Sequence, residues 1–485
     1  MAQTGAPERF SIGPVLWISL AFIFVISLPN LIDPMIRHDD FPALLGYGDA
    51  FYHKTLHEGR WINYIWHLRE IITPSWLNFA VYQICWAVFA ANIAVLAAPG
   101  QRITLLSVLL AALVLLTPPA TLISLWFNTL QLGIAIIAIY AVIVCKCSER
   151  TSRMLLPVFT VPALMAYTTY PLLLLALCLM RTRNRSVRDL FWLMVLFGAS
   201  FVGAILITYA LNWYFHGIFG IPLAEWRQAV PAGSFSEMWG NLGAAQETFI
   251  LFFGKSSFAS NSVFFAHVLA LVLATVVLAQ RAPLEVLYLY AGLLTGVALI
   301  TLQAVKLGIV VPARALIFFW IFYAVIVVRG IQVLNDRGAS AARLGVAAIV
   351  VVLFSYGAQA HKRYTLYHEW QGQTRQSAED LAALPAPYYV LGRAVHSEAG
   401  MSASIQSNFA LFFRITQLTG QEPLLCDSEG VDCSNLDRAA ALAQATSDWH
   451  VGQIDGKTVL VIREVEDPGE VGLNGATTGA WTPNG

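Results

Sequence analysis

The feature that most restricts the fold of this chain is a series of long apolar stretches. A helix needs about 17 to 25 mostly apolar residues to cross a bilayer. Hydrophobic residues make up 57% of the chain and charged residues 12%, whereas soluble domains carry about 25% charged residues. The sequence therefore predicts a mainly α-helical, polytopic membrane bundle, with spans at 15–36, 76–98, 103–121, 128–145, 190–211, 261–280, 284–303, 315–333 and 344–360.

The segment 154–180 is an exception, because it is long for one span and has basic residues at both ends. Short basic loops lie on the cytoplasmic side of a membrane, so both ends of this segment should lie on one side. We therefore expect two short legs that fold back at Ala166–Pro171, with Tyr167 and Tyr170 at the tip, since proline and aromatic residues suit such a turn. This hairpin brings the predicted bundle to eleven segments.

The basic residues also predict how the chain is oriented. Arg9, Arg102, the clusters on both sides of the hairpin, Arg281 and the loop 329–343 all fall on one side of the predicted bundle. The positive-inside rule makes that side cytoplasmic, with the N-terminus inside and the first span uncleaved. The opposite, external side then receives a first loop at 33–75, a second loop at 212–260 and everything after residue 361.

The predicted membrane domain covers 1–361, and a small external α/β domain at 362–465 and a disordered tail at 466–485 follow it. The domain should contain a strand at 387–391, an alanine-rich helix at 436–446, and two strands at 449–454 and 458–462 that flank the hairpin signal Asp455-Gly456. An oxidising compartment permits a disulfide between Cys426 and Cys433. Cys145 and Cys147 lack a second ligand pair, so no zinc site is expected there.

Two adjacent carboxylates, Asp39 and Asp40, follow the first span. Charged groups at the edge of a membrane bundle are costly to desolvate and are usually functional. After them, Trp61, Ile65 and Leu68 recur at helical spacing, which predicts short amphipathic helices in the membrane interface. A carboxylate held there can accept the proton of an incoming hydroxyl group as a general base.

Four features together resemble the bacterial Gtr-type glucosyltransferases that modify O-antigen, which belong to the GT-C superfamily. They are the acidic pair, an aromatic loop that ends in Gly59-Arg60-Trp61, the short hairpin with tyrosines at its tip, and Pro312-Ala313-Arg314 before a late span. The likeness in layout covers roughly residues 10 to 360. Two features differ, since Trp61 stands where a proline is expected and the external domain has no motif of the family.

The resemblance implies an enzyme that takes a sugar, expected to be a hexose, from a polyprenyl-phosphate carrier on the external face. The acceptor would be a surface glycan or lipid, and the protein would lie among the lipids of the bacterial inner membrane with its C-terminus in the periplasm. Asp39 would be the catalytic base, and Asp40 would orient it or contact the acceptor. Alternatively, Asp40 caps a helix that begins at Phe41-Pro42, because aspartate is a preferred cap and proline suits the first turn.

A lipid phosphate that leaves needs cations to stabilise its developing charge, and arginine suits this role best. Arg314 is the first candidate, Arg60 the second, and Lys255 and Lys306 follow. Arg314 could instead be an interfacial anchor beside its span. The tyrosines at the hairpin tip complete the expected substrate site. In the second loop, the aromatic groups at 212–216 and 225–227 could stack on a sugar ring or form an interface belt.

No cofactor is firmly expected. Asp49, His53 and His57 are four residues apart, so on one helix they would share a face and could bind a divalent metal, although interfacial histidines also simply meet water and headgroups. With 29 basic and 29 acidic residues, the chain has no net positive charge to attract nucleic acid.

The competing functions are a transporter or flippase for a lipid-linked or small polar substrate, and a purely structural membrane protein. A transporter would place its charges near the bilayer midplane, on broken helices in repeated halves. The acidic pair lies at the membrane edge instead, and the sequence has no visible repeat. A structural role would leave the acidic pair and the arginines without a task.

Overall fold

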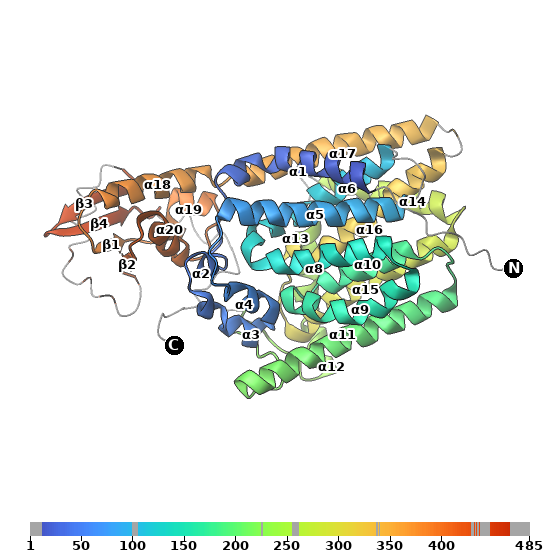
Figure 1. Cartoon of the computed structure of the whole chain (residues 1–485), viewed down its shortest axis with the longest axis horizontal. Coiled ribbons are helices and arrows are strands. Elements are labelled where there is room, and N and C mark those ends of the chain that lie inside the picture. The colour runs from blue at the N-terminus through green and yellow to red at the C-terminus, as the bar shows by residue number, and fades with distance from the viewer. Residues whose placement is uncertain are drawn as a thin grey trace.

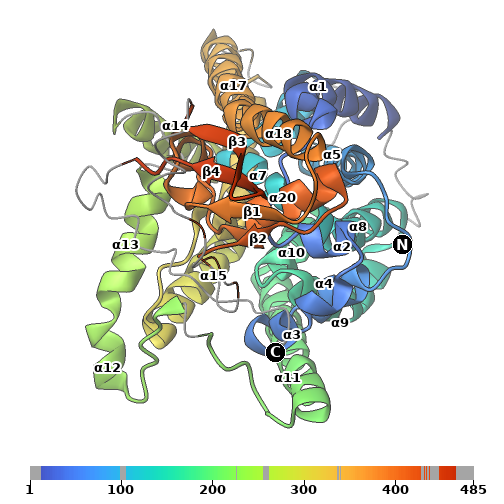
Figure 2. The ribbon, with the colours of Figure 1, turned by 90° about the vertical axis from the view of Figure 1, so that its left-hand side faces the viewer.

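The computed structural model of the chain describes residues 12–98, 105–224, 227–254, 261–335, 338, 340–427, 431, 433, 436 and 447–465. Long helices run side by side along the longest axis of the molecule, and a smaller domain that contains a β-sheet lies at one end (Figure 1). Seen from this end, the sheet lies over the bundle, with the short helices of the first loop beside it (Figure 2).

Each segment that the sequence predicts as a span or a hairpin leg coincides with a helix. These helices are α1 (Gly13–Ile32), α5 (Ser75–Ala97), α6 (Leu105–Leu116), α8 (Phe127–Lys146), α9 (Glu149–Ala166), α10 (Tyr170–Arg181), α11 (Val187–His216), α14 (Asn261–Ala279), α15 (Pro283–Leu307), α16 (Ile317–Asn335) and α17 (Ser340–Thr365). In the described part of the chain, seven helical stretches are long and apolar enough to cross a membrane. The structure thus supports a multi-pass membrane protein, while eleven crossings and their orientation stay predictions.

Prolines shorten two of the predicted spans. Helix α1 ends four residues before the predicted end of the span 15–36, with Asp33 in a non-helical conformation. The span predicted at 103–121 breaks at Thr117, which is extended, and a short helix α7 (Pro118–Ile123) follows. In both cases the break falls on the residue before a proline, where the ring disfavours helical backbone.

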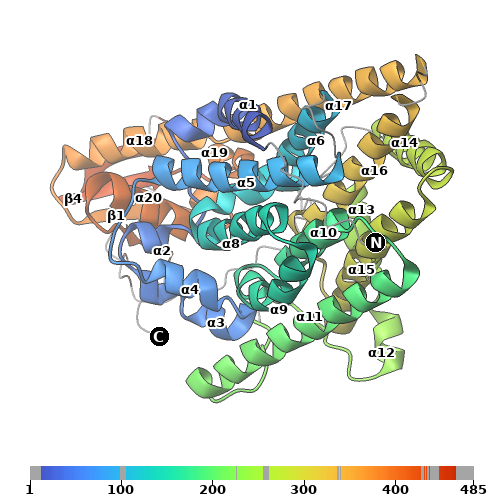
Figure 3. The same ribbon diagram turned by 45° about the vertical axis from the view of Figure 1, so that its right-hand side comes forward.

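The predicted hairpin at 154–180 is confirmed. Helix α9 ends at Ala166, the backbone of Tyr167 is extended, and α10 begins at Tyr170. The tip packs closely on α8, because a Cβ at Gly133 would lie 2.5 Å from the Ala166 Cβ. Helix α10 is buried along nearly its whole length and packs against α8, α9 and α15 at the centre of the bundle (Figure 3).

The smaller domain confirms the strands predicted from the sequence. Its sheet has the order β2-β1-β4-β3, in which β1 is parallel to β2 and β4, and β3 is antiparallel to β4. The hairpin between β3 and β4 turns at Asp455 and Gly456, both with positive φ, as the Asp-Gly signal predicts. The domain consists of α18 (His368–Ala382), β1 (Tyr388–Leu391), α19 (Glu398–Ser402), α20 (Phe409–Thr419), β2 (Leu424–Leu425), β3 (Trp449–Ile454) and β4 (Lys457–Ile462).

Cys426 and Cys433 form a disulfide bond, as the sequence permits. The predicted boundary at 361 falls inside α17, which continues to Thr365. Two predictions, the helix at 436–446 beyond its first residue and the tail at 466–485, lie outside the described residues.

The smaller domain packs directly on the first loop. The Arg37 guanidinium donates hydrogen bonds to the Tyr367 hydroxyl, at 2.8 Å, and to the Ser404 carbonyl, at 3.0 Å. The rings of Phe41 and Phe413 stack with 5.5 Å between their centroids. These contacts fix the part of the chain that carries the acidic pair.

Candidate functional site

The first loop folds into short helices, as predicted for an interfacial segment. They are α2 (Phe41–Leu44), the 3-10 helix η1 (Gly48–Phe51), α3 (His53–Glu58) and α4 (Trp61–His67). Gly59 ends α3 with a φ of 67°, and a Cβ there would lie 2.8 Å from side-chain atoms of Thr208 and Ile221. This tight glycine turn places Arg60 next to Glu58.

Asp40 binds the N-terminus of α8. Its buried carboxylate accepts hydrogen bonds from the backbone N–H groups of Asn128, at 3.1 Å, and Thr129, at 2.7 Å. Burial raises the pKa of Asp40 to about 7, while these donors favour its charged form. The expectation that Asp40 caps the helix at Phe41-Pro42 is wrong, because its side chain makes no capping hydrogen bond there. It caps a helix 88 residues further along the chain instead.

Asp39 lies beside it but points to different partners. One oxygen of its carboxylate lies 2.5 Å from the Lys54 Nζ and 3.4 Å from the His38 Nε2. Burial alone would raise the pKa of Asp39, but the Lys54 and His38 side chains hold it well below its usual range. In this arrangement Asp39 is charged and paired with a single flexible cation.

Glu58 is a third carboxylate of the site that sequence reasoning missed. It is buried and pairs with the guanidinium groups of Arg60, at 2.6 Å, and Arg227, at 3.3 Å, while Lys54 lies 3.5 Å away. Burial would raise its pKa, but these three cations lower it to about 2. Lys54 therefore lies between two carboxylates, Asp39 and Glu58. The available signal was the spacing, since Glu58 follows Lys54 by one helical turn and precedes Arg60 by two residues.

The hairpin tip closes the site on another side. The Arg60 guanidinium carbon lies 5.8 Å from the ring centroid of Tyr167, and the rings of Tyr167 and Tyr170 lie 5.4 Å apart. The Asn63 side chain donates a hydrogen bond of 2.9 Å to the Ala166 carbonyl. The structure thus brings together the predicted residues Arg60, Tyr167 and Tyr170.

Arg314 reaches the same region through Trp126, the residue before α8. The guanidinium carbons of Arg314 and Arg37 lie 4.3 and 5.3 Å from the Trp126 ring centroid. The pKa of His38 is lowered mainly by burial, and the positive charge of Arg314 lowers it further by a smaller amount. Among the described residues, Arg314 has no ion pair and its charge is available to a ligand.

Of the two other predicted cations, the structure places only Lys306. Lys306 donates a hydrogen bond to the Ala232 carbonyl of the second loop, and Lys255 lies outside the described residues.

The residues considered for a metal are bound to other groups. Asp49 belongs to η1 and His53 and His57 to α3, so they are not on one continuous helix. Asp49 accepts a hydrogen bond from the Tyr64 hydroxyl, and the two histidines contact the carbonyls of Ala50 and Pro222. Over the described ranges, no group of three His, Cys, Asp or Glu side chains is placed to hold a metal ion.

The second loop supports the first. Asn212 accepts a hydrogen bond of 2.9 Å from the Trp61 indole and donates one of 3.1 Å to the Leu56 carbonyl. Trp213 and Tyr214 are exposed by 63% and 77%, as in an interface belt. Of the aromatic group at 225–227, only Arg227 is described.

An apolar cavity lies next to the charged cluster. It has a volume of about 650 Å³ and is bounded by Ile221, Pro222, Leu223, Ala224, Gln228, Ala229, Pro231 and Leu307. The His57 ring lies 3.1 Å from the Pro222 carbonyl oxygen, and the Ile221 side chain packs on Gly59. The cavity therefore adjoins the turn that carries Arg60. Its wall is suited to an apolar chain rather than to a sugar.

The charges of the site do not balance. Lys54 and Arg60 are paired with Asp39 and Glu58, whereas Arg37 and Arg314 face the Trp126 ring and have no ion pair among the described residues. The charges of Arg37 and Arg314 are therefore not compensated by a described carboxylate in this partly buried region, which is costly unless an anion binds.

Comparison with known proteins adds no identity to this geometry. No model of a known protein family matches the chain, and no curated protein matches it significantly.

Proposed function

We propose that this chain is an integral-membrane glycosyltransferase. It would move a sugar, a hexose by the family resemblance, from a polyprenyl-phosphate carrier to a surface glycan or lipid acceptor. The observation that carries the proposal is the cationic surplus around Asp39, beside an apolar cavity, at the end of the bundle that carries the smaller domain. A phosphate attached to a long apolar chain meets both requirements.

The proposed donor site uses the cations that are not held by two carboxylates. They are Arg314, which has no ion pair among the described residues, and Arg60, whose one ion pair in the described part of the chain is with Glu58. Arginine binds phosphate through two parallel hydrogen bonds. The apolar cavity at Ile221 and Leu307 would hold the first part of the polyprenyl chain, and Tyr167, whose ring lies near Arg60, would face the sugar.

Lys54 connects donor binding to the base. A phosphate that reaches Arg60 and Lys54 would draw Lys54 away from Asp39, because both anions compete for one ammonium group. The pKa of Asp39 then rises toward its usual value of about 3.9, and Asp39 becomes a better proton acceptor. The ion pair between Lys54 and Asp39 would keep Asp39 from accepting a proton before the donor has bound.

In the proposed reaction the acceptor hydroxyl oxygen attacks the anomeric carbon of the donor sugar. The bond between that carbon and the phosphate oxygen breaks, the hydroxyl proton passes to Asp39, and the polyprenyl phosphate leaves with its charge held by Arg314. Asp40 holds Asp39 in place through its bonds to the N-terminus of α8. The proposal places this site on the external face of the bacterial inner membrane, with the N-terminus in the cytoplasm and the C-terminus in the periplasm.

The test is to compare surface glycans of cells with and without the gene by mass spectrometry. Loss of a hexose-sized mass in the deleted strain supports the proposal and identifies the acceptor. Unchanged glycans and lipids contradict it. If purified protein in vesicles moves a polyprenyl-phosphate sugar between leaflets without forming a product, the chain is a flippase instead.

A further inference from the structure

A second cavity lies at the opposite end of α9 from the site described above. Its volume is about 440 Å³, and it lies between the first turns of α9 and the facing side of α11. Ala166, at the site end of α9, is 13 residues from Arg153, so the two regions are separated by about 20 Å at 1.5 Å per residue. The lining residues are Glu149, Arg150, Arg153, Met154, Pro157 and Leu196.

The cavity has a polar end and an apolar end. Arg150 is exposed and, in the described ranges, has no ion pair, whereas Arg153 is mostly buried. One to two turns further along α9, Met154 and Pro157 form an apolar wall with Leu196 of α11. Such a gradient matches an amphiphile with an anionic head.

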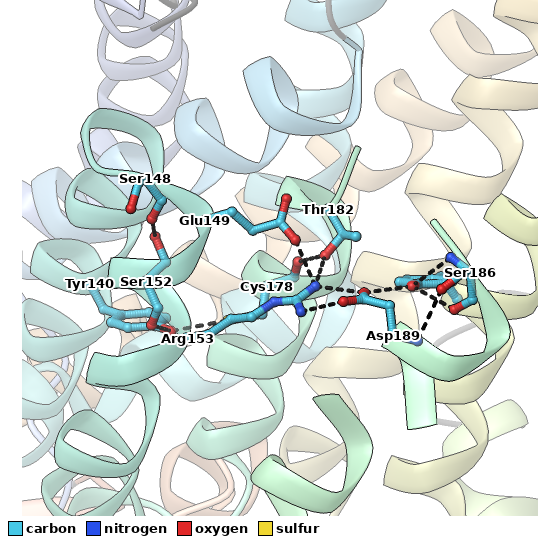
Figure 4. A network of polar contacts seen from close by, with 10 residues as sticks. Tyr140, Ser148, Glu149, Ser152, Arg153, Cys178, Thr182, Ser186 and Asp189 are labelled. Carbon is cyan, nitrogen blue, oxygen red and sulfur yellow. Dashed lines mark hydrogen bonds and ion pairs between the residues drawn. The ribbon is translucent and has the colours of Figure 1, made fainter. Parts of the chain in front are cut away.

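A network of polar contacts holds the polar end rigid. Arg153 makes two hydrogen bonds to the Asp189 carboxylate, at 2.6 and 2.7 Å, one of 2.8 Å to the Thr182 hydroxyl, and an ion pair of 2.7 Å with Glu149. Figure 4 shows Arg153 between Glu149 and Asp189, with Thr182 and Ser186 on adjoining segments. The network joins α9 to the start of α11 and fixes the gap between them.

The surroundings of the cavity are basic and lipid-facing. The segments 146–153 and 181–189 carry seven basic and two acidic residues. Beside the cavity, Met154 is exposed by 67% and Trp192, one turn before Leu196 on α11, by 57%. Exposed tryptophans mark the headgroup level of a bilayer, and basic pockets between membrane helices bind anionic headgroups.

We propose that this cavity binds an anionic glycerophospholipid, with its phosphate on Arg150 and its upper acyl chain against Met154, Pro157 and Leu196. The ion pairs of Arg153 set the position of the cavity, and Arg150 supplies the charge for the ligand. The site is separate from the proposed glycosyltransferase site and does not depend on it. A lipid held here would support the hairpin leg α9, whose other end carries the tyrosine tip.

Native mass spectrometry of the full-length protein, with added phosphatidylglycerol or phosphatidylcholine, tests the proposal. Phosphatidylglycerol should remain bound, and Arg150→Gln should weaken it about five-fold, since one basic residue near a membrane surface contributes about that factor. Arg188→Gln is the matched control, because Arg188 is an exposed arginine of the same segment that does not line the cavity. It should leave binding unchanged.

Three results would overturn the site. They are equal retention of phosphatidylcholine, an equal loss in Arg188→Gln and Arg150→Gln, and full competition by free glycerol 3-phosphate, which would show that the acyl chain adds nothing. Leu196→Trp, which fills the apolar end, provides a second readout that leaves the charges untouched. It should lower binding of phosphatidylglycerol and not that of glycerol phosphate.

Discussion

The Lys54 ammonium lies 2.5 Å from the Asp39 carboxylate and 3.5 Å from that of Glu58. One flexible cation therefore holds both carboxylates that face the cationic cluster. Because an ion-paired carboxylate is a poor proton acceptor, we propose that an anionic donor must move Lys54 before Asp39 can act.

This relationship predicts a change in pH dependence. Burial would raise the pKa of Asp39, and Lys54 is the largest of the causes that lower it, so Asp39 stays charged to a lower pH than usual. In Lys54→Met the pKa should rise, and the acidic limb of kcat/KM, which reports the free enzyme, should move to higher pH. Lys54→Arg keeps the charge and should keep the limb in place. If the wild type, Lys54→Met and Lys54→Arg have the same dependence of kcat/KM on pH, Lys54 does not control the pKa of Asp39.

A second prediction separates the roles of the two aspartates. Asp40→Ala should lower the melting temperature, because the N-terminus of α8 loses the acceptor for two N–H groups, and loss of a cap costs about 1 kcal/mol. Asp40→Asn keeps one acceptor and should cost less stability. Neither variant should abolish turnover once protein levels are matched. If Asp40→Asn melts like the wild type and is inactive, Asp40 acts in the chemistry.

The leaving group provides a third prediction. Arg314→Ala should reduce turnover about 100-fold to 1000-fold, the usual cost of removing one preorganised stabiliser of developing charge. Arg314→Lys should restore only part of it, because an ammonium group cannot form the paired hydrogen bonds of a guanidinium. Lys306→Ala is the comparison, since Lys306 bonds to a backbone carbonyl outside the cluster. If lysine replaces Arg314 freely, that residue is an interfacial anchor.

Topology can be tested without the reaction. A reporter that is active only in the periplasm, fused after Val465 at the end of the described sheet domain, should be active, because eleven segments that begin in the cytoplasm end outside. The matched fusion in the 182–186 turn between α10 and α11 should be inactive. The opposite pattern would place Asp39 on the cytoplasmic side, away from an external acceptor.

The sequence predicted the parts that depend on local patterns. Apolar length predicted the helices, flanking arginines predicted the α9–α10 hairpin, and Asp455-Gly456 predicted the turn between β3 and β4. The predicted C-terminal ends of two spans were wrong. Pro34 and Pro118 disfavour helical backbone at the residue before them, and this ends each helix although the sequence stays apolar.

The site was harder to predict, since its contacts join distant segments. Asp40 binds the backbone of residues 88 and 89 positions away, and no local rule indicates which helix a buried carboxylate will cap. Glu58 was missed because a glutamate on a short amphipathic helix usually faces water. Only the fold places Arg227 beside it. The predicted grouping of Arg60 with the hairpin tyrosines came from the resemblance, and the structure brings these side chains together.

The most direct measurement is sugar transfer from a purified polyprenyl-phosphate sugar to acceptor, by wild type and Asp39→Asn at matched levels of folded protein. The amide keeps the shape of the carboxylate and cannot accept the proton, so transfer should fall by about 100-fold to 10,000-fold, with the melting temperature showing that the protein is still folded. Near wild-type transfer by Asp39→Asn would contradict the base assignment. No transfer by the wild type itself would contradict the proposed enzyme.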